Sequence, residues 1–312
     1  MSEPTNNGLR SLQAVGFGEL LDTIFSLYRT HFWSFLRIAT LYFVAMLIGV
    51  SISFFDDWIG TGTKAAIWVF TIIAIVCVSV FVVSALVFAS AQAYLDGKVA
   101  TGTILKQAKR QFFRCLVSSL VFGLVTIPLT IFVVALFVAI YSSFESGEIS
   151  SGIGVLGVLL ILFLAAASFL TYWCFYISAI FVEDIAARSE LKRSGELIRD
   201  RWWRINGTML AILLLHFGIS FICRTAFEIL LTLTGLAEIT EFLGTIQWWA
   251  FLQLPRNLTE FHLLNALMHV VNLGIDTFTM PIWVIGATLL YFDQRIRKEG
   301  FDIEVMATRL GE

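Results

Sequence analysis

Charged residues inside long apolar runs are the positions in this chain where chemistry is first expected. Arg224 and Glu228 lie in the apolar run that follows Gly207, and Asp276 lies in the run that ends at Phe292. At a rise of about 1.5 Å per residue, Arg224 and Asp276 lie about 25 Å from the basic ends of their runs. If the runs cross a membrane, as their length allows, both residues lie toward the outer leaflet. Because isolated charges are costly at that depth, we predict that Arg224 pairs with Asp276, while Glu228 competes for the arginine from one helical turn away.

This intramembrane polar pair has two interpretations. In the functional one, the pair joins His269 and Asn272 in a polar cavity or a proton path. In the structural one, which we favour, the pair fastens two helices together or reaches the outer headgroups. A further histidine, His216, has no spaced partner and is typical of a hydrogen-bonded packing residue. A metal site would need more histidines or carboxylates at suitable spacing, so the sequence predicts neither a metal nor a cofactor.

Catalytic motifs are absent from the sequence. It contains no GxSxG, Walker loop, HExxH or dinucleotide fingerprint. We therefore predict no catalytic residues and a non-enzymatic protein. An enzyme acting on lipid is the third class considered, and no motif favours it.

Basic residues beside the apolar runs are the stronger functional candidates. They could form a cationic ring in which each cation contributes about 1 kcal/mol of attraction to an anionic leaflet. In a sharper version, Arg295 and Arg297 bind a phospholipid headgroup or an acidic cytosolic partner. The alternative is that these charges only orient the protein and bind lipid nonspecifically. We expect anionic lipids and an unidentified membrane or cytosolic protein as partners, and no nucleic acid. The predicted cluster comprises Arg29, Lys109, Arg110, Lys192, Arg193, Arg199, Arg201, Arg204, Arg295, Arg297 and Lys298.

The composition indicates a membrane protein. Hydrophobic residues make up 58% of the 312 residues and charged residues 14%, and the mean hydropathy is +0.85. About 20 apolar residues suffice for one crossing. We therefore predict an all-α membrane protein in which a disordered segment, 1–16, precedes a single six-span transmembrane domain, 17–312. The predicted spans are 32–55, 65–94, 115–141, 155–182, 207–232 and 267–292.

Three amphipathic segments, 17–31, 101–114 and 185–206, precede the odd-numbered spans. Each places apolar residues on one helical face and charged residues on the other, which is typical of a helix that lies on a membrane surface. Of the 21 Lys and Arg residues, all but Lys64, Arg224 and Arg256 belong to one side of the membrane. The positive-inside rule then predicts that both termini and all three surface helices face the cytoplasm.

A short pattern recurs at the start of each odd-numbered span. A cation is followed three and four residues later by two large aromatics, and each even-numbered span ends in an aromatic, an apolar residue and an acid. We predict three tandem helical hairpins, about 17–98, 99–184 and 185–300, with a short basic tail, 293–312. The alternative is that any multi-pass protein places such residues at interfaces. The cation–aromatic copies are Arg29/Phe32/Trp33, Lys109/Phe112/Phe113 and Arg199/Trp202/Trp203.

The most specific stretch runs from Tyr291 to Glu304, YFDQRIRKEGFDIE. Together with Gly18–Trp33 and Glu190–Trp203, it resembles the membrane domain attached to some glycerophosphoryl diester phosphodiesterases. Free-standing bacterial proteins that look similar are described as uncharacterised integral membrane proteins. The resemblance implies a bacterial inner membrane protein. The catalytic barrel of that family, with its His-Arg-Gly start and acidic metal ligands, has no counterpart in the sequence, so the resemblance does not imply phosphodiesterase activity.

These observations predict a multi-pass bacterial inner membrane protein that organises or supports other components at the cytoplasmic face. The alternative is a transporter or lipid-handling protein whose polar path passes Asp276 and Arg224. A water-filled cavity that reaches Asp276 would favour transport, whereas a closed bundle with a shaped cytoplasmic surface would favour support.

Overall fold

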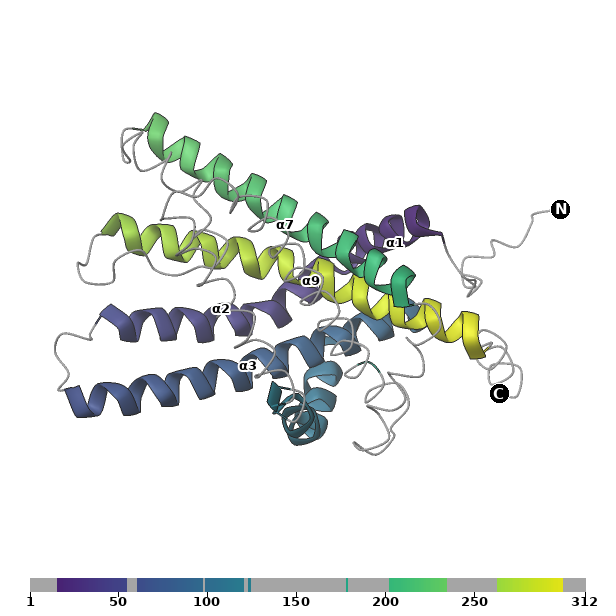
Figure 1. Ribbon diagram of the computed structural model, residues 1–312, viewed down its shortest axis with the longest axis horizontal. Coiled ribbons are helices and arrows are strands. Elements are labelled where there is room, and N and C mark those ends of the chain that lie inside the picture. The colour runs from purple at the N-terminus through teal and green to yellow at the C-terminus, as the bar shows by residue number, and fades with distance from the viewer. Residues whose placement is uncertain are drawn as a thin grey trace, which may run out of the picture.

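The computed structural model of the protein describes residues 16–54, 61–97, 99–120, 123–124, 178, 202–234 and 263–299. Within these ranges the regular secondary structure is helical, with no strand. Residues 101–120 form one helix without a label in Figure 1. The labelled helices are α1 (Phe17–Thr30), α2 (Phe32–Phe54), α3 (Thr61–Asp96), α7 (Trp202–Leu233) and α9 (Leu263–Glu299).

Four of these helices are long and apolar enough to cross a membrane. They coincide with the first, second, fifth and sixth predicted spans. The helical class is therefore confirmed for the described residues, and these four helices have the length and composition of membrane crossings. The third and fourth predicted spans, the surface helix at 185–206 and the basic tail lie largely outside the described residues. The candidate crossings are Phe32–Gly49, Ala66–Asp96, Trp202–Leu233 and Leu267–Lys298.

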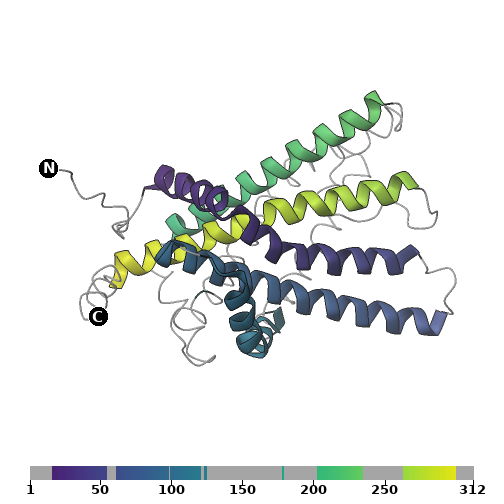
Figure 2. The same ribbon diagram turned by 180° about the vertical axis from the view of Figure 1, so that it is seen from behind.

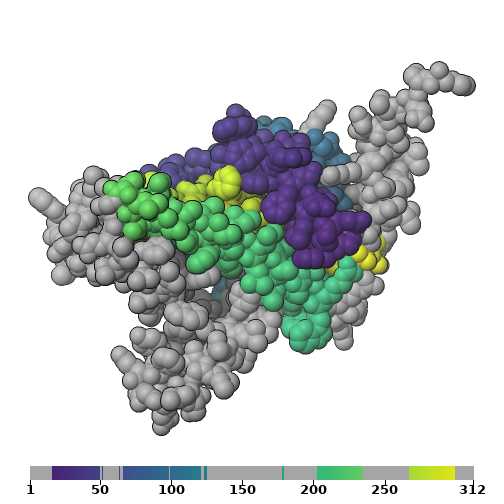
Figure 3. All heavy atoms as spheres, turned by 90° about the horizontal axis from the view of Figure 1, so that it is seen from above, coloured from purple at the N-terminus to yellow at the C-terminus, as the bar shows by residue number. Residues whose placement is uncertain are grey.

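Helix α9 is the centre of the described bundle. It packs against α1, α2, α3 and α7, and α2 also packs along α3. The end of α2, the start of α3, the end of α7 and the start of α9 lie at one end of the bundle in both ribbon views (Figures 1 and 2). We call this the connection end, and the opposite end, where α7 begins and α9 ends, the basic end. Figure 3 shows α9 largely covered on one face by α1, α2 and α7.

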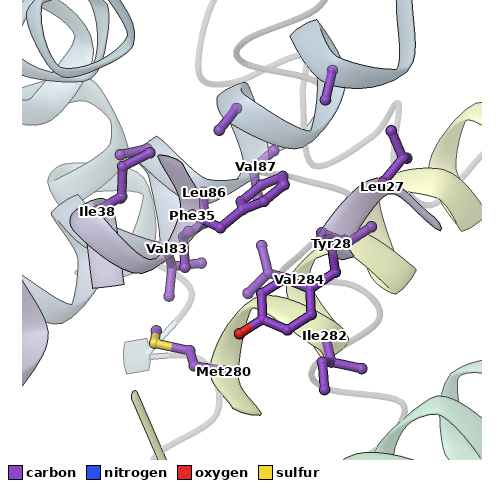
Figure 4. Close-up of a cluster of buried hydrophobic side chains, with 14 of the residues drawn as sticks. Leu27, Tyr28, Phe35, Ile38, Val83, Leu86, Val87, Met280, Ile282 and Val284 are labelled. Carbon is purple, nitrogen blue, oxygen red and sulfur yellow. The ribbon is translucent and has the colours of Figure 1, made fainter. Parts of the chain in front are cut away.

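The main core lies where α1 and α2 meet the middle of α3 and α9 (Figure 4). Apolar residues recur every three or four positions in α1, and that spacing places them on one face. Tyr28 from α1 and Phe35 from α2 pack in this cluster with Val83 of α3 and Met280 of α9. The buried Tyr28 hydroxyl donates a 2.7 Å hydrogen bond to the Phe278 carbonyl. Burial raises the pKa of the Tyr28 phenol.

The surroundings of α1 differ from the prediction. We expected the apolar face of this helix to lie in the lipid boundary, but Leu20 and Ile24 are buried in the protein core. Glu19, Asp22 and Arg29 are exposed, as the amphipathic pattern requires. The physical reason is that α9 offers an apolar protein surface beside α1, so side-chain packing takes the place of lipid.

Gly286 makes the close approach of three helices possible. A β-carbon at this position would lie 2.8 Å from Cγ2 of Ile212 in α7 and 3.1 Å from Cδ1 of Ile24 in α1. Carbon atoms pack best at about 3.5–4.0 Å, so only glycine fits without movement. This residue lies in the part of α9 that is most completely buried, residues 279–296, where only Trp283 is partly exposed.

Candidate functional site: a polar seam between α7 and α9

Polar residues follow one face of α7 at intervals of four. His216, Ser220, Arg224 and Glu228 occupy successive turns, and residues four apart lie above one another on a helix. The opposing face of α9 carries Asp276 and, three residues later, Thr279. We call these contacts the α7–α9 seam.

The predicted contact between Arg224 and Asp276 is present in the structure. Nη2 of Arg224 donates to Oδ1 of Asp276, and both side chains are largely buried. One turn earlier in α7, the Ser220 hydroxyl lies 3.0 Å from the hydroxyl of Thr279. The next turn brings Nδ1 of His216 within 3.2 Å of the Thr279 carbonyl oxygen. The seam therefore joins the two helices through three consecutive polar contacts.

Glu228 and His269 extend the polar surface toward the connection end. Glu228 lies within electrostatic range of Arg224, but the arginine contacts Asp276. His269 lies about two turns before Asp276 on α9 and is half-buried. Tyr42 of α2 lies within electrostatic range of Asp276, so a third helix contributes to the surroundings of the pair. The sequence reasoning missed Ser220, Thr279 and Tyr42, although the four-residue spacing on α7 was a usable signal for Ser220.

His216 is a hydrogen-bonded residue of a helix interface, as predicted. Its partner, the carbonyl of Thr279, lies two residues before Pro281, a proline inside α9. Proline has no N–H, so the carbonyl of Thr277 receives no helical hydrogen bond from that position. Around this interruption, side chains from other helices bond to the carbonyls of Phe278 and Thr279. The two bonds attach α1 and α7 to the same turn of α9.

A second ion cluster lies at the basic end, centred on Asp293. This carboxylate is only 4% exposed and accepts a 3.3 Å bond from Nη2 of Arg204. Nε of Arg297 lies 3.0 and 2.9 Å from its two oxygens. The sequence reasoning treated Asp293 as part of an exit pattern and not as an ion-pair partner. Arg204 and Asp293 come from α7 and α9, so the seam ends in a second interhelical ion pair.

This cluster changes the interpretation of the predicted cationic ring. Arg295 is buried, and Arg204 and Arg297 are paired with Asp293, so Arg295 and Arg297 do not form the open cationic surface that we expected. Their contact with a headgroup or an acidic partner stays a prediction. Arg295 lies two residues from both Asp293 and Arg297, so it points to a different side of the helix from the ion pair. Other members of the predicted cluster are exposed, namely Arg29, Lys109, Arg110 and Lys298. Lys192, Arg193, Arg199 and Arg201 lie outside the described residues.

The three aromatic pairs of the recurring pattern have similar geometry. Their ring centroids lie 5.3 Å apart in Phe32/Trp33, 5.6 Å in Phe112/Phe113 and 4.7 Å in Trp202/Trp203, and all three pairs are edge-to-face. In each pair the first ring is partly buried and the second is exposed. The hairpin repeat itself stays a prediction, because most of the second hairpin lies outside the described residues.

Some buried polar atoms lack partners within the described part of the chain. Both side-chain polar atoms of Asn206 and Oε1 of Gln294 are buried without a hydrogen bond. The two residues flank the Arg204–Asp293 pair along their helices. In the same described ranges, no group of three His, Cys, Asp or Glu side chains is placed to hold a metal ion.

Comparison with known proteins identifies no relative. No protein-family model, curated protein or solved structure matches the chain. The family resemblance described above therefore stays a prediction that rests on its short motifs.

Proposed function

We propose that the protein is a non-enzymatic, multi-pass component of a bacterial inner membrane that supports other membrane components through a basic cytoplasmic surface. The observation that carries the proposal is the division of faces on the helix at residues 101–120. Ile104 and Ala108 are buried, whereas Lys106, Lys109 and Arg110 are exposed. Because the apolar face is already occupied by protein, the cationic face is the one available to a partner.

Anionic lipid headgroups are the proposed first partner of this face. At about 1 kcal/mol for each cation, three cations contribute about 3 kcal/mol, which corresponds to roughly a hundredfold in binding. Arg29 of α1 adds a fourth exposed cation. An acidic cytosolic protein would recognise the same charges, and it would bring shape-specific contacts that lipids lack.

The test replaces Lys106, Lys109 and Arg110 together with glutamine. Lipids and proteins that copurify after crosslinking in native membranes are then identified by mass spectrometry. We expect insertion to be unchanged and anionic lipids or a specific protein to be depleted. The matched control exchanges Lys for Arg and Arg for Lys at the same positions and should retain both. The proposal fails if the neutral variant retains the same lipids and proteins as the control.

A second candidate is a transporter or lipid-handling protein whose polar path follows the seam. The specific observation in its favour is the alignment of His216, Ser220 and Arg224 against Thr279 and Asp276. A path requires water or a headgroup to reach these groups. Proteoliposomes that leak protons or scramble labelled lipids with the native chain, and not with Asp276→Asn, would favour this candidate over support.

A further inference from the structure

The described bundle is longer than a hydrocarbon core. Helix α3 has 36 residues and α9 has 37. At about 1.5 Å per residue each is about 55 Å long, whereas the hydrocarbon core is about 30 Å thick. Helix α2 has 23 residues, and its length of about 34 Å matches the core. An untilted α3 or α9 therefore extends about 25 Å beyond the hydrocarbon.

Contacts between aromatic rings mark the level at which α2 begins. The Phe32 ring lies 5.8 Å from the ring of Phe278, so the start of α2 lies beside the middle of α9. Phe112 of the helix at 101–120 lies 6.0 Å from Phe81, near the middle of α3. Both aromatic pairs of the first two hairpins therefore lie at the level of the main core, far from the basic ends of α3 and α9.

The exposure of apolar side chains changes at this level. Toward the connection end, large apolar residues on α2, α3, α7 and α9 face outward, including Ile48, Phe70, Leu230 and Leu267. Toward the basic end, no residue of α3 between positions 80 and 93 is exposed, and neither is any residue of α9 between 279 and 296. Lipid-facing helices expose apolar side chains, whereas these segments are covered by protein.

Exposed rings and cations form a collar at the same level. Trp33 is 68% exposed and Phe113 is 76% exposed. Exposed cations lie three or four residues from these rings, at positions 29, 37, 109 and 110. Aromatic rings with adjacent basic residues are typical of the headgroup layer, where long cationic side chains reach the phosphates. Arg37 follows Trp33 by one turn, and helical side chains lean toward the helix N-terminus, which here is the headgroup side.

We propose that the hydrocarbon boundary on the basic side crosses the bundle at the level of Trp33 and Phe113, where this collar contacts anionic lipid headgroups. The basic halves of α3 and α9, together with α1, then form a protein-packed body that projects from the hydrocarbon. The basic half of α7 lies at the surface of this body, where Trp203 and Leu214 stay exposed. This inference concerns the depth of the chain in the bilayer and does not depend on which components the protein supports.

This boundary gives the Arg224–Asp276 pair a different depth in the bilayer from the one that we predicted. Asp276 precedes Phe278 by two residues, or about 3 Å along the helix. The pair then lies just inside the boundary, within reach of headgroups and water, instead of in the outer leaflet as its distance from the helix ends suggested. This shallow position also lowers the desolvation that two charges must undergo.

The test compares two leucines on α7, Leu214 at 55% and Leu230 at 56% exposure. Ile212 contacts Gly286, eight residues beyond Phe278, so Leu214 lies on the headgroup side of the proposed boundary. Leu230 lies on the opposite side of the Arg224–Asp276 pair, within the apolar band. Each is changed to cysteine in a full-length chain whose four native cysteines are replaced by alanine, and Thr30→Cys on α1 serves as the exposed reference.

A membrane-impermeant maleimide is applied to inside-out and right-side-out vesicles, and total thiol is measured after SDS denaturation. We expect Leu214→Cys to be labelled to the same extent as Thr30→Cys and Leu230→Cys to remain unlabelled. The inference is overturned if Leu214→Cys is protected in both vesicle types while Thr30→Cys reacts, or if Leu230→Cys reacts as well. Labelling of Leu214→Cys confined to right-side-out vesicles supports the depth and contradicts the cytoplasmic orientation on which the proposed function rests.

Discussion

Replacing Gly286 with alanine should destabilise the bundle more than its small volume suggests. The new β-carbon would lie 2.8 Å from Cγ2 and 3.0 Å from Cδ1 of Ile212, and 3.1 Å from Cδ1 of Ile24. Ile212 and Ile24 are fully buried. A β-branched side chain in a helix has essentially one χ1 rotamer, so Ile212 cannot rotate away, and the helices themselves must separate.

The expected loss of unfolding free energy follows from the overlap between the new β-carbon and the two isoleucines. Contacts about 0.4–1.2 Å shorter than the optimum of about 3.5–4.0 Å on two sides correspond to overpacking of a closed core, which costs about 1–3 kcal/mol. Alanine also gains about 0.5–1 kcal/mol over glycine within a helix. A control must therefore separate the helix term from the steric one.

Gly274 supplies that control, because it lies on the same helix and a β-carbon there would meet nothing within 4 Å. Unfolding free energies are measured by SDS titration of the protein in mixed micelles, with helical circular dichroism as the signal. We expect Gly274→Ala to be as stable as the native chain or more so, and Gly286→Ala to be about 1–3 kcal/mol less stable than Gly274→Ala. Equal stability of the two variants would refute the close packing of α1, α7 and α9 at Gly286.

Three further predictions concern polar groups. Asp276→Asn and Arg224→Gln should each lower the unfolding free energy by up to about 3 kcal/mol, and the double variant should lose less than the sum; additive losses in a double-mutant cycle would contradict direct coupling. Burial raises the pKa of Tyr28 and lowers the pKa of His31. Stability should therefore fall as pH rises above about 10 and also as it falls below about 6.5, and Tyr28→Phe should remove only the alkaline loss in pH-dependent melts. Asn206→Leu should raise the melting temperature, since it removes two unpaired buried polar atoms at a gain of about 1 kcal/mol or more; a loss of stability would indicate a hidden partner.

The long apolar runs were sufficient to predict helices α2, α3, α7 and α9. The border expected between a surface helix and a span at 114/115 instead falls inside one helix, 101–120. The positions of the charges predicted the contact between Arg224 and Asp276. Both residues lie deep in their apolar runs, and an unpaired charge in such surroundings is so unfavourable that few arrangements remain. Two runs that are neighbours in the sequence, joined by one connection, place the charges on adjacent helices. The prediction of this contact therefore needed only the depth of each residue, without knowledge of the packing angles.

The burial of α1 could not be predicted in the same way. An amphipathic stripe such as Leu20, Ile24 and Tyr28 indicates that one face of the helix avoids water, but either lipid or protein can cover that face. The choice depends on Gly286, whose missing side chain allows α1 and α7 to approach α9 together. The burial of Arg295 was also not predictable from the sequence, because the residue belongs to a packed helix whose exposed face is set by neighbouring helices.

The two ion pairs of the α7–α9 seam constrain each other, and this bears on what the seam can do. Arg204 meets Asp293 near one end of the contact and Arg224 meets Asp276 near the other. The helices are antiparallel, so a slide of one turn would separate both pairs at once. Arg224 and Asp276 would then lose each other while largely buried, whereas Asp293 would keep Arg297 of its own helix. Two bonded contacts therefore fix the register of α7 against α9 more strongly than apolar side chains, which tolerate small shifts. A transport cycle that opened this seam would have to break both pairs together, whereas a supporting role requires only that they persist. That energetic asymmetry is the physical reason to place support ahead of transport.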